Sequence, residues 1–178
     1  VATSAVREAA NGPVFLDRIR DEIGISIQLL DGEKEAYYDT LGALNEVPLS
    51  EGVVLDIGGG SIQLSDVQKR QFNRGNSISL GALALTERFI TRDPISGKEY
   101  RNIEKEISRQ LDTIHWLPEK QGEPLVGLGG TIRNLAMIEA SQQKYPLHTQ
   151  HGFVLKRSSV KKSIQLFREL PLKERQKI

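Results

Sequence analysis

Hydrophobic residues recur every three or four positions in several segments of the chain, which is the period of an amphipathic helix. Phe15, Ile19 and Ile23 form one such stripe after Asn11, and Gly24 is typical of a helix C-terminus. Similar patterns predict further helices over 33–44, 83–90, 103–114 and 132–140, and a last one around 160–167.

Other apolar segments have the pattern of strands. Residues 25–30 begin with period-two alternation, and 53–57 form a continuous apolar run of the kind buried on both faces of a sheet. Gly75-Asn76 is expected to be a turn between two strands. The remaining strands are predicted at 1–6, 62–65, 78–80 and 125–128. This order of strands and helices predicts an α/β layered fold.

A polar segment divides the chain into two parts. Residues 45–52 carry both Pro48 and Gly52, as linkers between domains often do. The expected division is therefore into residues 1–48 and residues 52–178.

Composition narrows the classes of function. The 178 residues hold 24 Lys and Arg against 23 Asp and Glu, which argues against a polybasic nucleic-acid binder. Lys156-Arg157 and Lys161-Lys162 are accordingly interpreted as a solvated helix face. There is no cysteine, and no apolar run approaches the roughly 20 residues of a membrane span. We expect a cytoplasmic protein that handles a small ligand, without nucleic-acid or membrane partners.

Two predicted strands end in glycine clusters that close with a hydroxyl residue. The first cluster, Gly58-Gly59-Gly60-Ser61, joins two strands, and the second, Gly129-Gly130-Thr131, opens a helix. Glycines let backbone N–H groups converge on an anion, and a helix N-terminus favours a phosphate. Neither cluster is a Walker A loop, because no Gly-Lys-Ser/Thr follows. Together the two clusters predict phosphate binding, although a glycine triplet between strands also forms hairpins that bind nothing.

Acidic residues stand beside these turns. Asp56 ends an apolar strand directly before the first cluster, where an unpaired carboxylate is unfavourable to bury, so we expect it to face a metal ion or a cleft. Glu33 and Glu35 begin a predicted helix, where acidic residues also serve simply to offset the helix dipole. His148 and His151 lie on a loop, and their spacing there is a poor indication of a metal site.

The ordered motifs resemble the exopolyphosphatase/guanosine pentaphosphate phosphatase family, within the actin, heat-shock chaperone and sugar kinase superfamily. The resemblance covers nearly all of the chain. Its anchors are the two glycine clusters with Asp56-Ile57, and the segments Ala2–Ala9, Gly32–Ala36, Leu80–Ala82 and Leu85–Phe89.

The resemblance implies a ribonuclease H-like (actin-like ATPase) fold, in which a mixed β-sheet is flanked by helices and two lobes face a cleft. Residues 1–48 resemble the end of the first lobe. Residues 52–178 resemble most of the second, phosphate-binding lobe, with the last helix expected to pack back on the first. The family's first phosphate loop and its C-terminal helical domains have no counterpart, so we expect an internal fragment that is inactive alone.

Members of that family release terminal phosphate from inorganic polyphosphate or guanosine pentaphosphate with a divalent cation such as Mg²⁺. The resemblance implies that Glu35 activates the attacking water, and that Asp56 and Gln63 lie at the cation. It implies phosphate binding by Arg7 and by the residues of both clusters, namely Gly58, Gly59, Gly60, Ser61, Gly129, Gly130 and Thr131. A homodimer is also expected.

Two positions depart from the family pattern. Gln63 stands where the family usually has Glu, and an amide oxygen without charge holds Mg²⁺ more weakly. Ala84 stands where an Arg is usual. Both departures favour the alternative of a non-catalytic sensor that binds polyphosphate or guanosine polyphosphates. A kinase of the same superfamily is a further alternative, against which Glu35 speaks because a kinase needs no water-activating base there.

Overall fold

A computed structural model of the protein describes residues 1–146 and 149–178, so that His148 lies outside the described residues. At its centre is a four-stranded sheet in the order β3-β2-β1-β4. The strands are β1 (Gly52–Ile57), β2 (Ile62–Gln68), β3 (Gln71–Ile78) and β4 (Leu125–Leu128). β1 pairs with β2 in antiparallel and with β4 in parallel orientation, which confirms the expected mixed sheet.

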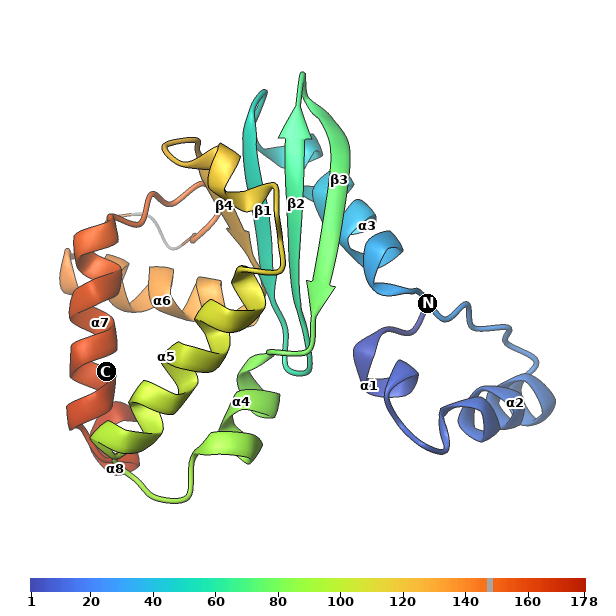
Figure 1. Ribbon diagram of the computed structural model, residues 1–178, viewed down its shortest axis with the longest axis horizontal. Helices are drawn as coiled ribbons and strands as arrows, with labels where there is room; N and C mark the ends of the chain where they lie inside the picture. The colour runs from blue at the N-terminus through green and yellow to red at the C-terminus, as the bar shows by residue number, and fades with distance from the viewer. Residues whose placement is uncertain (147–148) are drawn as a thin grey trace.

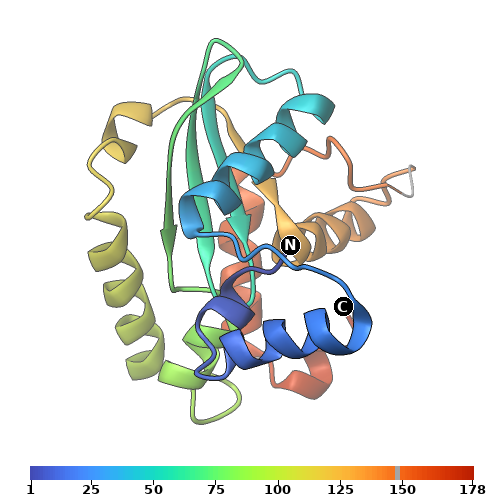
Figure 2. The same ribbon diagram turned by 90° about the vertical axis from the view of Figure 1, so that its right-hand side faces the viewer.

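Helices surround the sheet (Figure 1). α3 (Gly32–Glu46) crosses one face, and α4 (Ala82–Phe89), α5 (Gly97–Leu111) and η1 (Leu117–Lys120) follow β3 in the chain. At the β4 side lie α6 (Gly129–Gln142), α7 (Arg157–Glu169) and α8 (Leu172–Arg175). α1 (Ser4–Arg7) and α2 (Gly12–Ile23) lie apart from the sheet, on the right in Figure 1 and toward the viewer, near the lower end of the sheet, in Figure 2. No helix in the described part of the chain is long and apolar enough to cross a membrane.

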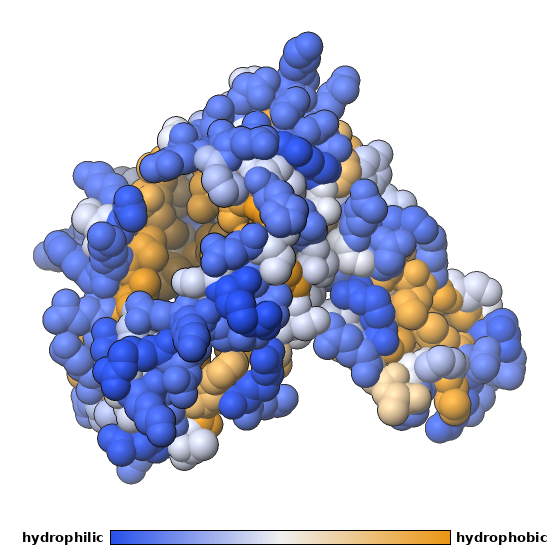
Figure 3. All heavy atoms as spheres, viewed as in Figure 1, coloured by the Kyte–Doolittle hydropathy of each residue, from blue (hydrophilic) through white to orange (hydrophobic). Residues whose placement is uncertain are grey.

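Each face of the sheet has its own hydrophobic core. The core beneath α3 holds Ala43, Leu44, Leu49, Val54 and Val67. The core on the opposite face holds Val53, Leu64, Ile114 and Trp116. The two sets alternate along β1 and β2, as the period of a strand requires. By contrast, hydrophobic side chains of α2 remain exposed at the surface, as Figure 3 shows on the right.

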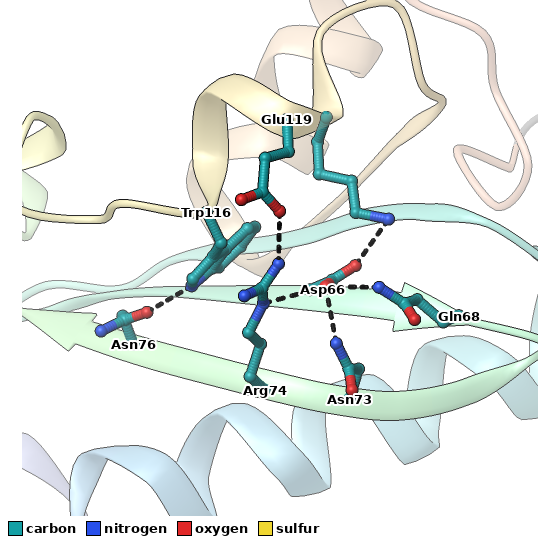
Figure 4. A network of polar contacts seen from close by, with 8 residues as sticks. Asp66, Gln68, Asn73, Arg74, Asn76, Trp116 and Glu119 are labelled. Atoms are coloured by element: carbon teal, nitrogen blue, oxygen red, sulfur yellow. Dashed lines mark hydrogen bonds and ion pairs between the residues drawn. The ribbon is translucent and has the colours of Figure 1, made fainter.

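A buried carboxylate ties η1 to the far end of the sheet (Figure 4). Asp66 on β2 is fully buried at 0% exposure. One carboxyl oxygen accepts hydrogen bonds from Asn73 Nδ2 at 2.9 Å and Arg74 Nε at 3.1 Å, and the other lies 2.7 Å from Lys120 Nζ. Arg74 also pairs with the exposed Glu119 at 2.8 Å. This network lies at the opposite end of β2 from the first glycine cluster.

The predicted turn at Gly75-Asn76 is wrong, because both residues lie inside β3. Gly75 is needed for packing, since a Cβ there would come within 2.9 Å of the Ala36 Cβ on α3. The turn is made instead by Lys69 and Arg70, which have positive φ angles of 51° and 61°. The strand predicted at 78–80 is also wrong, because β3 ends at Ile78 and only that first residue belongs to it.

The two strands predicted near the N-terminus are also wrong. Residues 1–6 and 25–30 share only an isolated parallel bridge between Ala2 and Leu29, and α1 begins at Ser4. A strand needs a continuous partner for its ladder, and no strand of the sheet lies beside these residues within the described chain. Ile25 therefore remains 54% exposed despite its alternating neighbours.

Candidate active site

The first glycine cluster forms the hairpin turn between β1 and β2. The Gly58 amide donates to the Ser61 carbonyl at 3.0 Å and closes the turn. The carbonyls of residues 58–60 accept hydrogen bonds from the amides at the start of α4, residues 81–83, at 2.9–3.0 Å. Among the described residues, the N–H groups of residues 59–61 have no hydrogen-bond acceptor. The turn therefore presents free donors, as an anion-binding loop does.

The second cluster lies against the end of β1. Because β1 and β4 are parallel, with Asp56 opposite Leu128, both clusters lie at the same edge of the sheet. Gly129 has a positive φ of 84°, and a Cβ there would lie 2.2 Å from Asp56 Oδ1, so only glycine fits. Gly130 faces open space. No side chain caps the α6 N-terminus and its first turn has no acidic residue, which leaves its amides to an anion.

Asp56 lies between the two clusters. Its Oδ1 is buried and has no hydrogen-bond partner in the described chain. Burial raises the pKa of this carboxyl, and the nearby charge of Glu35 raises the pKa further. An orphaned carboxylate oxygen of this kind fits a ligand for a divalent cation.

Glu35 reaches the same region from the first turn of α3. Its carboxylate lies 3.1 Å from Arg7 Nη1, and the same guanidinium nitrogen donates to the Leu30 carbonyl at 2.8 Å. Arg7 therefore holds the Glu35 carboxylate in place, and phosphate binding by Arg7 stays a prediction. α1 also approaches the first cluster, because a Cβ on Gly60 would lie 3.0 Å from Ser4 Oγ.

Asp39 is a carboxylate that the sequence analysis missed. It follows Glu35 by one helical turn, and both line a pocket of about 440 Å³ together with Tyr38 and Leu30. Asp39 Oδ2 is buried without a hydrogen-bond partner in the described chain. Burial, followed by the charges of Asp56 and Glu35, raises the pKa of Asp39 to about 7. The spacing of four residues from Glu35 was the one signal that could have indicated it.

This raised pKa predicts an unusual dependence of stability on pH. The folded state binds the Asp39 proton more tightly than the unfolded state, so stability falls as pH rises from about 4 to about 7. Asp39→Asn removes the ionisation and is expected to stabilise the protein by about 1–3 kcal/mol near pH 8. Urea unfolding across this range measures the difference, which should vanish near pH 4. The exposed Asp112→Asn serves as the control, and equal behaviour of the two variants would contradict the prediction.

Gln63 is the cross-strand neighbour of Asp56. Its side chain is buried, and its amide nitrogen donates to Ser61 Oγ at 2.8 Å and to Ser77 Oγ at 3.0 Å. Only the amide oxygen is left to contact a cation, so the predicted ligand role rests on that atom. Ser61 is itself buried, and its hydroxyl contacts Gln63.

The residues around Asp56 are suited to a Mg²⁺ ion that keeps several water or substrate ligands, and less to a metal ion coordinated by protein side chains alone. Among the described residues, no three Asp, Glu or His side chains come together as a metal cluster. Mg²⁺ commonly takes one or two carboxylates and completes its shell with water and substrate phosphates. Asp56, between two sets of amide donors, matches that pattern.

Comparisons with known proteins place the chain in a family. The model of the Ppx/GppA phosphatase family matches residues 1–178. The chain belongs to this family. The Ppx/GppA chain is 33% identical over 141 residues to exopolyphosphatase 1 of Mycobacterium leprae, which covers 77% of the chain and 42% of that protein. It is 25% identical over 178 residues to a bifunctional 3-dehydroquinate synthase/phosphatase of Fusobacterium nucleatum, covering 93% of the chain and 26% of that protein.

Solved structures give the same family. The Ppx/GppA member from Aquifex aeolicus superposes with a TM-score of 0.80 and 32% identity, over 99% of this chain and 56% of that one. An exopolyphosphatase from Cytophaga hutchinsonii, 23% identical, shares the fold with a TM-score of 0.83, over 97% of this chain and 57% of that one. This Ppx/GppA chain thus spans half or less of the length of these two curated relatives, and somewhat more than half of the solved chains.

Proposed function

We propose that the protein hydrolyses terminal phosphoanhydride bonds of inorganic polyphosphate or guanosine pentaphosphate with a divalent cation. One observation carries the proposal: two sets of free backbone donors, an unpartnered Asp56 and the Glu35 carboxylate gather at one edge of the sheet. Phosphoryl transfer needs this combination of anion binding and charge neutralisation more than it needs covalent chemistry.

In the proposed reaction, Glu35 accepts a proton from a water molecule whose oxygen attacks the terminal phosphorus. The bond from that phosphorus to the bridging oxygen breaks, and the shortened phosphate chain leaves. Arg7 orients the Glu35 carboxylate through their ion pair at 3.1 Å. A general base must lie close to the water that it activates. Glu35 would meet this requirement with the terminal phosphate bound at the glycine clusters.

Asp56 and the amide oxygen of Gln63 would hold the cation, which neutralises developing charge on the phosphate oxygens when it is bound. The amides of residues 59–61 and of the α6 N-terminus would contact the phosphates from two sides. Thr131, in the first turn of α6, would add a hydroxyl donor. Gly129 keeps the helix close to Asp56 because it has no side chain.

Phosphate release tests the proposal directly. The full-length gene product and the 178-residue chain are each given long-chain polyphosphate or guanosine pentaphosphate, with and without Mg²⁺. Release that requires Mg²⁺ supports the hydrolase and identifies its substrate, and we expect the 178-residue chain alone to be inactive. Binding of either ligand without any release from the full-length product supports the sensor instead, as the amide at Gln63 would favour.

The missing charge at Gln63 gives a quantitative prediction. Gln63→Glu places a second carboxylate opposite Asp56. In the full-length gene product, the Mg²⁺ concentration for half-maximal phosphate release is therefore expected to fall several-fold. Gln71→Glu makes the same change at an exposed position of β3 and is the control. Thermal melts confirm that both variants fold. An unchanged Mg²⁺ requirement in the Gln63 variant contradicts its place at the cation.

A further inference from the structure

Positive charge is concentrated at the C-terminal end of the chain. Residues 156–178 hold eight Lys and Arg against two Glu, whereas residues 1–155 hold 16 Lys and Arg against 21 Asp and Glu. The near-neutral total therefore hides a basic segment, which forms α7 and α8, attached to an acidic remainder. In Figure 3 the side of the molecule that carries α5 and α7 is covered largely by hydrophilic residues.

Three of these cations form a stripe along one face of α7. At 100° per residue, Arg157, Lys161 and Arg168 lie within about 40° of one another and span about 16 Å of the helix. Lys161 and Arg168 line a groove of about 540 Å³ between α7 and α5. The Arg168 guanidinium stacks 3.7 Å above the Tyr100 ring, which fixes it at the groove. We call these three residues the α7 stripe.

The α7 stripe has no acidic partner. Among the described residues, no carboxylate oxygen lies within 4.0 Å of a side-chain nitrogen of its three members. Glu104 and Glu169 also line the groove, but each has a neutral donor: the Tyr100 hydroxyl for Glu104, and Gln165 Nε2 at 3.2 Å for Glu169. Exposed cations without partners are free to contact an anion.

The opposite side of α7 differs. Lys156 and Lys162 lie near Glu139 of α6, where their positive charges help to lower the pKa of that carboxyl. Ser159 Oγ donates to the same carboxylate at 2.6 Å, which joins α7 to α6. Glu139 follows Gly129 by ten residues, or about 15 Å along the helix. α6 therefore connects the second glycine cluster to α7.

We propose that the α7 stripe is a second binding site for phosphate, which holds the part of a long inorganic polyphosphate chain that extends beyond the glycine clusters. The inference rests on the proposed function and deepens it, because it assigns a preference for long chains. A linear polyanion with regularly spaced charges matches a row of cations along one helix. A short phosphate such as tripolyphosphate cannot reach across the length of α6 to occupy both places.

The test compares two double variants of the protein that remove the same charge. Arg157→Ala with Lys161→Ala removes two cations of the stripe and spares Arg168, whose ring contact has a packing role. Lys156→Ala with Lys162→Ala is the matched control, because it removes two cations that lie near Glu139, one at the N-cap of α7 and one within α7. All four side chains are exposed, so both variants are expected to fold, as circular dichroism checks. The probes are long-chain polyphosphate, tripolyphosphate and a single-stranded RNA of equal phosphate content.

We expect the stripe variant to bind long-chain polyphosphate about tenfold more weakly near 0.1 M salt, with a salt dependence reduced by about 1.4 in log–log slope. The ratio of the affinities for long-chain polyphosphate and tripolyphosphate should also fall in the stripe variant. The control variant should change the affinity for long-chain polyphosphate by no more than about twofold. Equal losses in the two variants, or tighter binding of RNA than of polyphosphate, would overturn the inference. Binding is measured without turnover, so absence of phosphate release refutes the proposed hydrolase and leaves this test intact.

Discussion

Glu35→Gln in the full-length gene product is expected to lower the rate of phosphate release by about 100-fold or more, with little change in the affinity for polyphosphate. The amide keeps the shape of the side chain and can still accept a hydrogen bond from Arg7, which lies 3.1 Å from the present carboxylate. It cannot accept a proton from water, so the loss falls on the chemical step. Initial rates at saturating Mg²⁺ and substrate measure the effect, and binding is followed by calorimetry.

Glu33→Gln is the matched control for this variant. Glu33 lies in the same first turn of α3, two residues earlier, and its side chain is exposed. The control removes the same charge from the same helix end, so it corrects for any change in the field around the phosphates. A rate of phosphate release close to that of the wild type in the Glu35 variant would contradict the role of Glu35 as the base, whatever rate the Glu33 variant shows.

Asp66→Ala is expected to give the largest loss of stability, about 3–5 kcal/mol in the free energy of unfolding. The substitution leaves Lys120 with a side chain only 9% exposed beside an empty position, and it removes the acceptor of Asn73 and Arg74. Glu119→Ala is the control within the same network. That carboxylate is 64% exposed and pairs with Arg74 at the surface, so its loss should change stability by less than about 1 kcal/mol. Urea unfolding of the two variants near neutral pH measures both values.

The Asp66 carboxylate should also contribute to unfolding in acid. Burial alone would raise the pKa of Asp66, but hydrogen bonds from Lys120, Asn73 and Arg74 outweigh burial and hold the pKa below its usual 3.8. A lowered pKa stabilises the fold above the unfolded value and this contribution is lost as pH falls toward the folded value. Stability of the wild type should therefore decline more steeply below about pH 4 than that of Asp66→Ala.

Local signals predicted the elements that surround the site. The apolar run ending at Asp56 and the two glycine clusters are properties of short segments, and the parallel pairing of β1 with β4 brings them to one edge. The helix that begins beside Glu35 was indicated by its period, and Asp31 caps it by accepting a hydrogen bond from the Lys34 amide at 2.8 Å.

Features that depend on distant segments were not predictable. Gly75 has the local pattern of a turn residue, and only the approach of α3 reveals that its missing side chain serves packing. Asp39 stands between Tyr38 and Thr40 on a helix and has the local pattern of a solvated position. Its burial follows from how α3 lies across the sheet near Asp56, which no short segment specifies.

The pairing of α4 with the first glycine cluster has a further consequence. The first amides of α4 are bonded to the carbonyls of residues 58–60, and a Cβ on Gly81 would lie 2.2 Å from the Gly59 carbonyl oxygen. The peptide planes of the turn are therefore held in place when the domain folds, while the N–H groups of residues 59–61 have no acceptor among the described residues. An arriving phosphate loses little affinity to ordering the loop, because that entropy was lost during folding. The glycines are flexible in the unfolded chain, but in the folded protein they form a preorganised turn.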